Sequence, residues 1–511
     1  MTRRDVLKSS LLAAGITEAP VVAQENRNPH SWPESARATG GGRMPNILWI
    51  CADQQRFDTI SGLNNQHVRT PNLQKLMGES VTFTHAFVQN PVCSPSRASF
   101  LTGRYPHTTG LRANGQRIRP NERLVTRILA DHGYTCGLAG KMHLSPCEGG
   151  RNEERIDDGY QAFWWSHDLS DQWPGKNMWH VWLKDKGIKW PEAPPRTPAW
   201  GVPIDPAYTQ TAWCSEMAMQ FMRQQRNFNP WLMSVNIFQP HHPFWPTKDY
   251  FDRYDPDKLP SPAFHQGELD SKPVYQRVDH QGAYGGTAIS FAKTDDLTHR
   301  KVTAAYYAMI EQVDTEVGRM LKTLEDTGQA DNTIVIYMSD HGEMLGDHGI
   351  YLKGPYFYDC AMRVPLMIRW PGRYKAGLRS DALVEMVDLV PTLLDAAGIP
   401  VHSGVQGRSL TRVLTGQSTK HRDSVYSEHF DSSSLYQTPP MAACIRTERH
   451  KLTYFHNSPA GELYDLEKDP GEVENLWVSP RAKDIRQEMM EKLVGRMVET
   501  VDPLPERKTT W

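Results

Sequence analysis

Side chains with oxygen and nitrogen ligand atoms follow two apolar segments of this 511-residue chain. The run 46–51 ends just before Asp53 and Gln54, and the run 333–338 ends just before Asp340 and His341. Short, nearly continuous apolar runs are typical of strands that are buried on both faces of a parallel sheet. Ligands of such sheets bind just beyond the carboxyl ends of the strands. These four side chains are therefore predicted to meet at one edge of a sheet.

Two further apolar runs lead to basic side chains. Residues 135–139 precede Lys141 and His143, and residues 231–238 precede His241. A single lysine is more often a solvated surface charge than part of a site. Its position relative to the other clusters therefore decides whether it belongs to a site. Because all of these clusters follow predicted strands, we expect them at the same edge of the sheet.

A cysteine stands at the start of a short predicted helix. Ser94 is a candidate N-cap, Pro95 falls in the first turn, and Gly103 ends the helix. The free N–H groups and the dipole at a helix N-terminus favour an anion beside Cys93, and Arg97 adds a positive charge one turn later. Because a single cysteine is more often a buried apolar residue than a nucleophile, the surrounding pattern must decide between the two.

That pattern resembles the sulfatase family of the alkaline phosphatase superfamily, whose signature is C-x-P-S-R followed by T-G-R. Cys93-Ser94-Pro95-Ser96-Arg97 and Thr102-Gly103-Arg104 match it, and the resemblance extends from about residue 45 to about residue 475. It implies that a dedicated enzyme oxidises Cys93 to formylglycine, whose hydrated form attacks sulfur with one hydroxyl. A serine would leave a sulfate ester that water must break, whereas the second hydroxyl expels sulfate from within.

The resemblance also implies a divalent metal site at the strand ends. The implied ligands are Asp53, Gln54, Asp340 and His341, with the modified Cys93 completing the set. Because most of the ligand atoms are oxygens, Ca²⁺ is expected first and Mg²⁺ second. Many sulfatases have two further oxygen ligands in place of the Gln and His, so Mn²⁺ stays open.

The same resemblance assigns charge and proton-transfer roles. Arg97, Lys141 and Lys353 are implied to clamp the sulfate oxygens, where fixed positive charge stabilises the transition state. His143 is implied to help abstract the hemiacetal proton, and His241 to assist the leaving oxygen.

Helical periodicity between the predicted strands completes an α/β pattern. Apolar residues recur at three- and four-residue steps over 301–327, which predicts a long helix. With the resemblance, the alternation implies an alkaline phosphatase-like mixed sheet sandwiched by helices. Short runs beyond residue 422 indicate antiparallel strands, and 482–498 predicts a closing amphipathic helix. We therefore predict an export signal and linker at 1–43, a catalytic sulfatase domain at 44–421 and a smaller C-terminal α+β domain at 422–511.

The N-terminus predicts export. Arg3 and Arg4 precede a weakly apolar stretch at 9–16, as in a twin-arginine signal. A tail with two chance arginines is the alternative, because Glu18 interrupts the apolar stretch. The chain is therefore expected to be periplasmic or secreted. No later run approaches the length of a membrane span, so none is predicted.

Composition excludes several classes of partner and site. The net charge is -2, from 57 basic and 59 acidic side chains, so no overall field recruits nucleic acid or an anionic membrane. The seven cysteines lack C-x-x-C spacing, which argues against a zinc ribbon or a thioredoxin-like site. A disulfide between Cys136 and Cys147 is left open.

The predicted reaction is the hydrolysis of sulfate monoesters, after maturation by a formylglycine-generating enzyme. Export and an aromatic-rich insertion at 163–190 favour a sulfated carbohydrate over an aryl sulfate. The nearest alternative is a phosphonate monoester or phosphodiester hydrolase of the same superfamily, which resembles this chain at Asp53-Gln54 but lacks the Gly-Lys-x-His pair. An inactive glycan-binding protein is the alternative from another class.

Overall fold

The computed structural model describes residues 44–147, 151–169, 176–190, 198–225, 229–433 and 436–505. The predicted export signal and linker lie outside these residues. Within them, no helix is long and apolar enough to cross a membrane.

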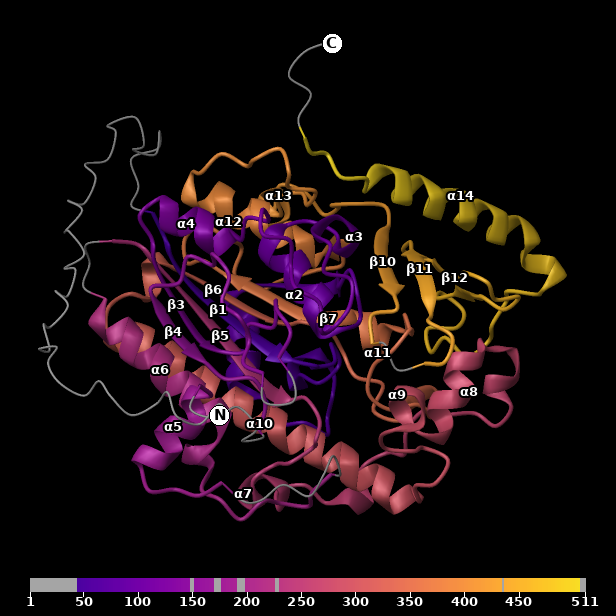
Figure 1. Ribbon diagram of the computed structural model, residues 1–511, viewed down its shortest axis with the longest axis horizontal. Helices are drawn as coiled ribbons and strands as arrows, with labels where there is room; N and C mark the ends of the chain where they lie inside the picture. The colour runs from indigo at the N-terminus through magenta and orange to yellow at the C-terminus, as the bar shows by residue number, and fades with distance from the viewer. Residues whose placement is uncertain are drawn as a thin grey trace, which may run out of the picture. The chain divides into compact units, whose positions relative to one another are not determined.

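A mixed sheet of nine strands forms the centre of the described part of the chain (Figure 1). Its strands are β1 (Asn46–Asp53), β2 (Val81–Phe87), β3 (Thr135–Gly140), β4 (Ala162–Trp165), β5 (Trp231–Pro240), β6 (Thr333–Ser339), β7 (Arg363–Arg369), β8 (Leu378–Ser380) and β9 (Val384–Glu385). Their order is β4-β3-β5-β1-β6-β7-β2-β8, with β9 paired to β2. Strands from β4 to β6 are parallel, and β7 is antiparallel to both of its neighbours. The predicted mixed sheet is therefore confirmed.

The burial of the central strand β1 explains why this segment of the sequence is an unbroken apolar run. Every residue of β1 is buried. Ile47, Trp49 and Cys51 enter the hydrophobic cluster on one face, while Leu48 and Ile50 enter the cluster on the other. Successive side chains of a strand point to opposite faces, so a sheet covered on both sides requires apolar residues at every position.

Helices supply that cover on both faces (Figure 1). One face carries α2 (Cys93–Thr102), α4 (Val125–Asp131) and α12 (Leu389–Ala397), and the other carries α1 (Pro71–Glu79), α6 (Gln210–Gln224) and α10 (Asp296–Asp326). The remaining helices, apart from the last, are α3 (Pro106–Thr109), α5 (Met178–Asp185), α7 (Lys248–Phe251), α8 (Val274–Gln281), α9 (Ala283–Gly286), α11 (Asp359–Met362) and α13 (Thr411–Leu414).

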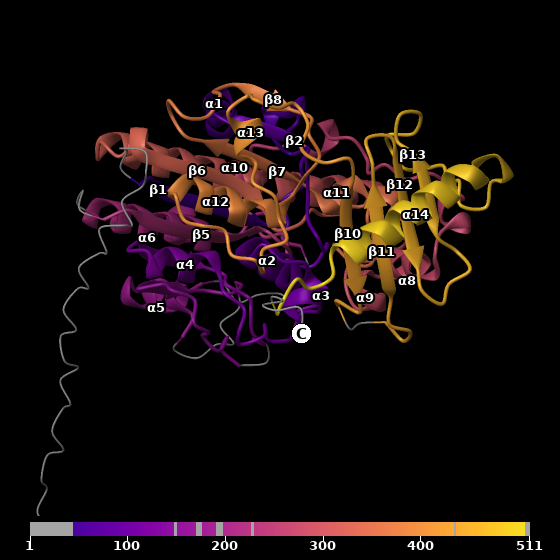
Figure 2. The ribbon, with the colours of Figure 1, turned by 90° about the horizontal axis from the view of Figure 1, so that it is seen from above.

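A smaller antiparallel sheet follows toward the C-terminus. It contains β10 (Val425–Phe430), β11 (Met441–Arg446), β12 (His450–Phe455) and β13 (Glu462–Asp465), in that order. Helix α14 (Lys483–Glu499) lies against β11 and β12 (Figure 2), where its Met489 and Leu493 pack on Leu452 and Leu463. This arrangement confirms the smaller α+β part of the predicted fold. The domain boundary at 421–422 stays a prediction, because Arg43–Trp511 forms one compact unit.

Three local expectations need correction or a fuller account. Ser94 is not the N-cap: α2 begins at Cys93, and the Ser94 amide donates to Asn114 Oδ1 at 3.0 Å, so a remote side chain satisfies the helix start. Cys136 and Cys147 are both free thiols, as are the other five cysteines, all of which the structure describes. In the aromatic insertion, Trp179 is fully buried and packs against Trp190, so these rings fill the core.

Candidate active site

The carboxyl ends of β1 and β6 bring the predicted metal ligands together. Because Ala52 pairs with Ser339, Asp53 and Asp340 leave adjacent strands side by side. His341 Nε2 lies 3.7 Å from Asp53 Oδ1 and 3.8 Å from Asp340 Oδ1. One ligand atom from each of these residues and from Cys93 falls within 4.8 Å of all the others, and all four residues are buried.

Cys93 reaches this cluster from the N-terminus of α2. Its Sγ lies 3.1 Å from His341 Nε2 and 3.9 Å from Asp53 Oδ1. The C-terminal end of α2 is set by Gly103, whose left-handed φ of 71° ends the helix as predicted.

Gln54 borders the cluster differently from the other ligands. Its side-chain oxygen accepts from Lys353 Nζ at 2.8 Å, and its amide nitrogen donates to Glu343. The same ammonium lies 2.9 Å from Cys93 Sγ and 3.2 Å from His341 Nε2. Three of the predicted ligand atoms therefore converge on one positive charge, and with the two carboxylates they fit a divalent cation.

Lys141 extends from the end of β3 toward Asp53. Its Nζ lies 2.6 Å from Asp53 Oδ2. The preceding Gly140 has φ 106°, and a Cβ there would lie 1.9 Å from the Asn236 carbonyl oxygen. Only glycine lets β3 approach β5 this closely while it turns Lys141 into the site.

Arg97 contacts the two carboxylates of the predicted metal site. Its Nε donates to Asp340 Oδ2 at 2.9 Å, its Nη2 to Asp53 Oδ2 at 3.3 Å and its Nη1 to the Lys141 carbonyl at 3.0 Å. The guanidinium is fully buried. It therefore holds both carboxylates in place.

These cations set the protonation states of the site. Burial acts to raise the pKa of Asp53, but Lys141 and Arg97 outweigh it and hold the pKa well below the usual range. Burial likewise acts to raise the pKa of the Cys93 thiol, yet Lys141 and Lys353 lower it to about 7. The position of Cys93 therefore favours a negative charge, as a nucleophile and its reaction intermediates require.

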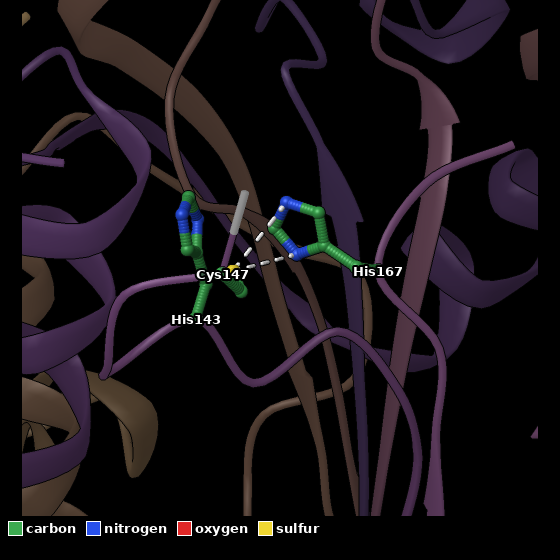
Figure 3. A group of neighbouring side chains, drawn as sticks. All are labelled: His143, Cys147 and His167. Carbon is green, nitrogen blue, oxygen red and sulfur yellow. Dashed lines mark hydrogen bonds between the residues drawn. The ribbon is translucent and has the colours of Figure 1, made fainter. Parts of the chain in front are cut away.

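Two histidines flank the cations as neutral rings. Burial and the Lys141 charge hold the pKa of His143 well below its usual range, and burial and Lys353 do the same for His241. His241 follows β5, with its Nε2 2.7 Å from Lys353 Nζ. His143 lies beside Cys147 and His167 (Figure 3). The structure thus groups Lys353 with His241, and Lys141 with Asp53.

Three further side chains shape the site, two of which sequence reasoning missed. Glu343, which follows His341 closely in the sequence, accepts from the Gln54 amide and from the Leu345 N–H. Glu153 accepts the N–H of His143 at 2.8 Å, and no sequence pattern distinguishes it. Tyr284 is half-buried, with φ 57° and its ring centroid 5.5 Å from that of His242, which stacks on His241.

The fold and site define a hydrolase of the alkaline phosphatase type. The sulfatase family model matches residues 45–399, and an N-sulphoglucosamine sulphohydrolase C-terminal model matches residues 346–499. The chain belongs to the sulfatase family and is a sulfuric ester hydrolase.

Individual relatives cover nearly the whole chain. It is 30% identical to an arylsulfatase of Clostridium perfringens over 88% of this chain and 95% of that protein. It is 25% identical to an N-acetylglucosamine-6-O-sulfatase of Bacteroides thetaiotaomicron over 92% and 89% of the two chains. Among solved structures, a phosphonate monoester hydrolase from Silicibacter pomeroyi superposes with a TM-score of 0.77 at 27% identity, covering 90% of this chain and 96% of that one.

Proposed function

We propose that this enzyme removes sulfate from a sulfated carbohydrate, with formylglycine made from Cys93 as nucleophile and a divalent cation, Ca²⁺ first, at Asp53, Gln54, Asp340 and His341. One observation carries the proposal. Cys93 Sγ stands at the helix N-terminus where His341 Nε2, at 3.1 Å, and Lys353 Nζ, at 2.9 Å, meet. A nucleophile at this point adjoins both the metal ligands and a fixed positive charge.

Hydrated formylglycine supplies one hydroxyl that attacks sulfur and a second that expels sulfate, and the cation supplies further positive charge. The protein's own residues orient and neutralise the reacting groups. Lys141 and Lys353 offer ammonium groups to the sulfate oxygens, whose negative charge would draw them from Asp53 and Gln54. Arg97 holds Asp53 and Asp340 in place, and with Lys141 it keeps Asp53 ionised.

The two neutral histidines take part in different proton transfers of the reaction. His143 Nδ1 has no hydrogen-bond partner in the described part of the chain, so the ring is available to accept the hemiacetal proton. His241 Nδ1 contacts the His242 carbonyl, which leaves Nε2 beside Lys353 for the leaving oxygen. Because the ring is neutral and its Nε2 accepts from Lys353, the proton that the leaving oxygen takes comes from the Lys353 ammonium and passes through Nε2.

A carbohydrate is favoured by the relatives and by the rim of the site. Proteins similar to this chain include an N-acetylglucosamine-6-O-sulfatase, an ulvan-active sulfatase and an iduronate 2-sulfatase. Tyr284 presents a half-buried aromatic ring beside His242, on the side where the leaving group would sit. An aromatic face at that position suits a sugar ring.

Phosphonate monoester or phosphodiester hydrolysis is the second candidate, supported by the superposition on a phosphonate monoester hydrolase. Lys141 and His143 distinguish sulfate ester hydrolysis from phosphonate or phosphodiester hydrolysis. Wild-type enzyme should show a higher kcat/KM for a sugar or aryl sulfate than for the matching phosphonate. Lys141→Ala and His143→Ala should each lower sulfatase activity by about 10²-fold or more. A phosphonate preference that persists in both variants would establish the second candidate, and glycan binding without turnover would indicate an inactive binding protein.

Sulfate release from a panel of sulfated glycans would identify the sugar. We also infer export in a folded state through Arg3 and Arg4, after maturation by a formylglycine-generating enzyme. Replacing both arginines by lysine should retain the protein in the cytoplasm, whereas an unchanged periplasmic yield would overturn the export inference.

A further inference from the structure

A second group of metal-binding side chains lies at the ends of β3 and β4. His143 and Cys147 belong to the loop that follows β3, and His167 follows β4 (Figure 3). Cys147 Sγ lies 3.5 Å from His167 Nδ1, and one ligand atom of each residue falls within 4.8 Å of the other two. The two imidazole rings meet edge to face, with centroids 4.7 Å apart.

The surrounding backbone holds these three side chains in place. Gly140 pairs with Trp165 across β3 and β4, and the Ser166 N–H donates to the Gly140 carbonyl at 3.1 Å. The Glu153 carboxylate accepts from the His143 N–H at 2.8 Å and from Trp165 Nε1 at 2.8 Å. The two loops are thus joined through one half-buried carboxylate, so their side chains meet without a bound ligand.

One atom of the group lacks a partner. His143 is 8% exposed, and its Nδ1 makes no hydrogen bond to the described residues. A buried polar atom without a partner costs stability, and nearly all such atoms in native proteins are satisfied. Coordination to a cation would satisfy this nitrogen.

The donor atoms select the kind of cation. Two imidazole nitrogens and one thiolate sulfur suit Zn²⁺, which binds histidine at about 2.0 Å and cysteine at about 2.3 Å with tetrahedral geometry. Ligands around such an ion lie roughly 3.3 to 3.8 Å apart by this geometry. Cys147 Sγ lies 3.5 Å from His167 Nδ1 and 3.8 Å from His167 Nε2, so the sulfur faces the ring and a rotation of the His167 ring would direct one nitrogen at a shared ion. Ca²⁺ prefers oxygen ligands and would remain at the Asp53 cluster.

Charge balance also permits a cation here. Burial, together with the Lys141 charge, lowers the pKa of His143. The same positive charge opposes the binding of a cation at this group. Glu153 is half-buried beside the loop, and burial together with the Glu153 charge raises the pKa of the Cys147 thiol. When Cys147 loses its proton to solvent and binds the ion as a thiolate, it and Glu153 together offset both charges of the ion.

We propose that His143, Cys147 and His167 form a second cation site that takes Zn²⁺, and that filling this site inhibits the enzyme. Zn²⁺ bound to the His143 ring would prevent that ring from accepting the hemiacetal proton. The inhibition rests on the proposed function, because it requires His143 in the reaction. The binding does not, and it is tested separately.

Cobalt is the spectroscopic probe for binding, because a Co²⁺–thiolate bond gives an intense near-ultraviolet absorption band. Matured full-length enzyme should develop this band with one Co²⁺ per chain, and Zn²⁺ should remove it. Cys147→Ser should abolish the band, while the matched control Cys136→Ser, at another buried free thiol, should retain it. His167→Gln, as a second variant, should weaken Co²⁺ binding at least tenfold. A missing band in wild type, or a band that persists in Cys147→Ser, would overturn the site.

Activity in saturating Ca²⁺ tests the inhibitory role. Zn²⁺ at the concentration that displaces Co²⁺ should lower kcat at least tenfold in wild type. Cys147→Ser should require at least tenfold more Zn²⁺ than wild type for the same fractional inhibition of its own activity. A Co²⁺ band without Zn²⁺ inhibition would overturn the proposed inhibition and leave the proposed cation site standing. A band in an enzyme with no sulfatase activity would count against the proposed function and leave the binding site standing.

Discussion

The ammonium of Lys141 lies 2.6 Å from Asp53 Oδ2, although 88 residues separate the two in the chain. The other carboxylate oxygen of Asp53, Oδ1, faces Cys93 and His341. One oxygen therefore pairs with the lysine while the other remains directed at the proposed metal. Lys141 neutralises a metal ligand and offers the same charge to sulfate.

Removal of this lysine should separate metal binding from turnover. Lys141→Met takes away a positive charge that competes with a cation for Asp53, so Ca²⁺ should bind several-fold more tightly. The turnover number should still fall by about 10²-fold, because the sulfate loses a fixed charge. Calorimetric Ca²⁺ titration and steady-state kinetics measure the two effects. Weaker Ca²⁺ binding in Lys141→Met would show that the lysine mainly maintains the structure.

Cys93 should carry formylglycine when the protein is made in a host with the maturation enzyme. Mass spectrometry of the peptide that contains residue 93 should show a loss of about 18 Da relative to the thiol, because CHO replaces CH₂SH. Cys93→Ser should lack both the mass change and multiple turnover. Active enzyme with only the unmodified thiol would contradict the proposed nucleophile.

Activity should depend on a divalent cation held by Asp340. Chelation should abolish turnover, and Ca²⁺ or Mg²⁺ should restore it. Asp340→Asn should weaken the cation affinity by about 10²-fold, on the scale expected when a metal site is disturbed. Asp347→Asn is the matched control, because Asp347 lies in the same loop but pairs with Arg56 at 2.7 Å. Metal content is measured by elemental analysis, and full activity in a metal-free sample would refute the dependence.

His241 and His242 form a pair of stacked rings that should differ in function. His241→Gln should lower kcat/KM for a sugar sulfate by about 10²-fold, because the sugar oxygen needs a proton as it leaves. The loss should be much smaller for 4-nitrophenyl sulfate, whose leaving oxygen is stable as an anion. His242→Gln serves as the neighbouring control and should change either rate by less than about tenfold. Equal losses of His241→Gln on both substrates would exclude assistance to the leaving group.

Arg422 should stabilise the fold through Asp388 and Glu385. It contacts Asp388 and lies 2.5 Å from Glu385, and all three side chains are buried. Arg422→Met leaves these carboxylates without their partner, so the free energy of unfolding at pH 7 should fall by about 3–5 kcal/mol. Urea denaturation measures the change, and the exposed Arg412→Met is the control expected to show almost none.

The same pair should make stability depend on pH in a defined direction. Burial acts to raise the pKa of Asp388, but Arg422 and His421 hold it well below its usual range. A carboxyl with a depressed folded-state pKa stabilises the protein above its unfolded-state pKa of about 4, and this stability is lost as the pH falls below that value. Wild type should therefore lose more stability than Arg422→Met between pH 7 and pH 3. A larger acid loss in the variant would contradict this assignment.

Much of the site could be predicted because its chemistry lies in short contiguous segments. The pattern around Cys93 identifies the family, and the polar residues after the apolar runs predict the metal ligands. The runs themselves recur as β1, β3, β5 and β6 with bounds that differ by only a few residues. Periodicity likewise predicts the long helix α10, although the helix begins earlier, where Asp295 caps it by accepting from Thr298 N–H.

The remaining features depend on pairings between distant parts of the chain. The antiparallel placement of β7 between β6 and β2 has no local signal, because register is set by whichever strands meet in the sheet. The contacts of Arg97 with Asp53 and Asp340 likewise have no local signal in the sequence. A buried guanidinium needs carboxylate partners, and only the folded chain decides which ones come within reach.

The sequence alone therefore determined the chemical groups, the family and the strands that carry the groups, since each is encoded within a few consecutive residues. The tertiary structure decided which groups touch: Lys353 with Cys93 and Gln54, Lys141 with Asp53, and Cys147 with His167. Those contacts form only when strands far apart in the sequence align and exclude water, because burial is what makes such polar pairings obligatory.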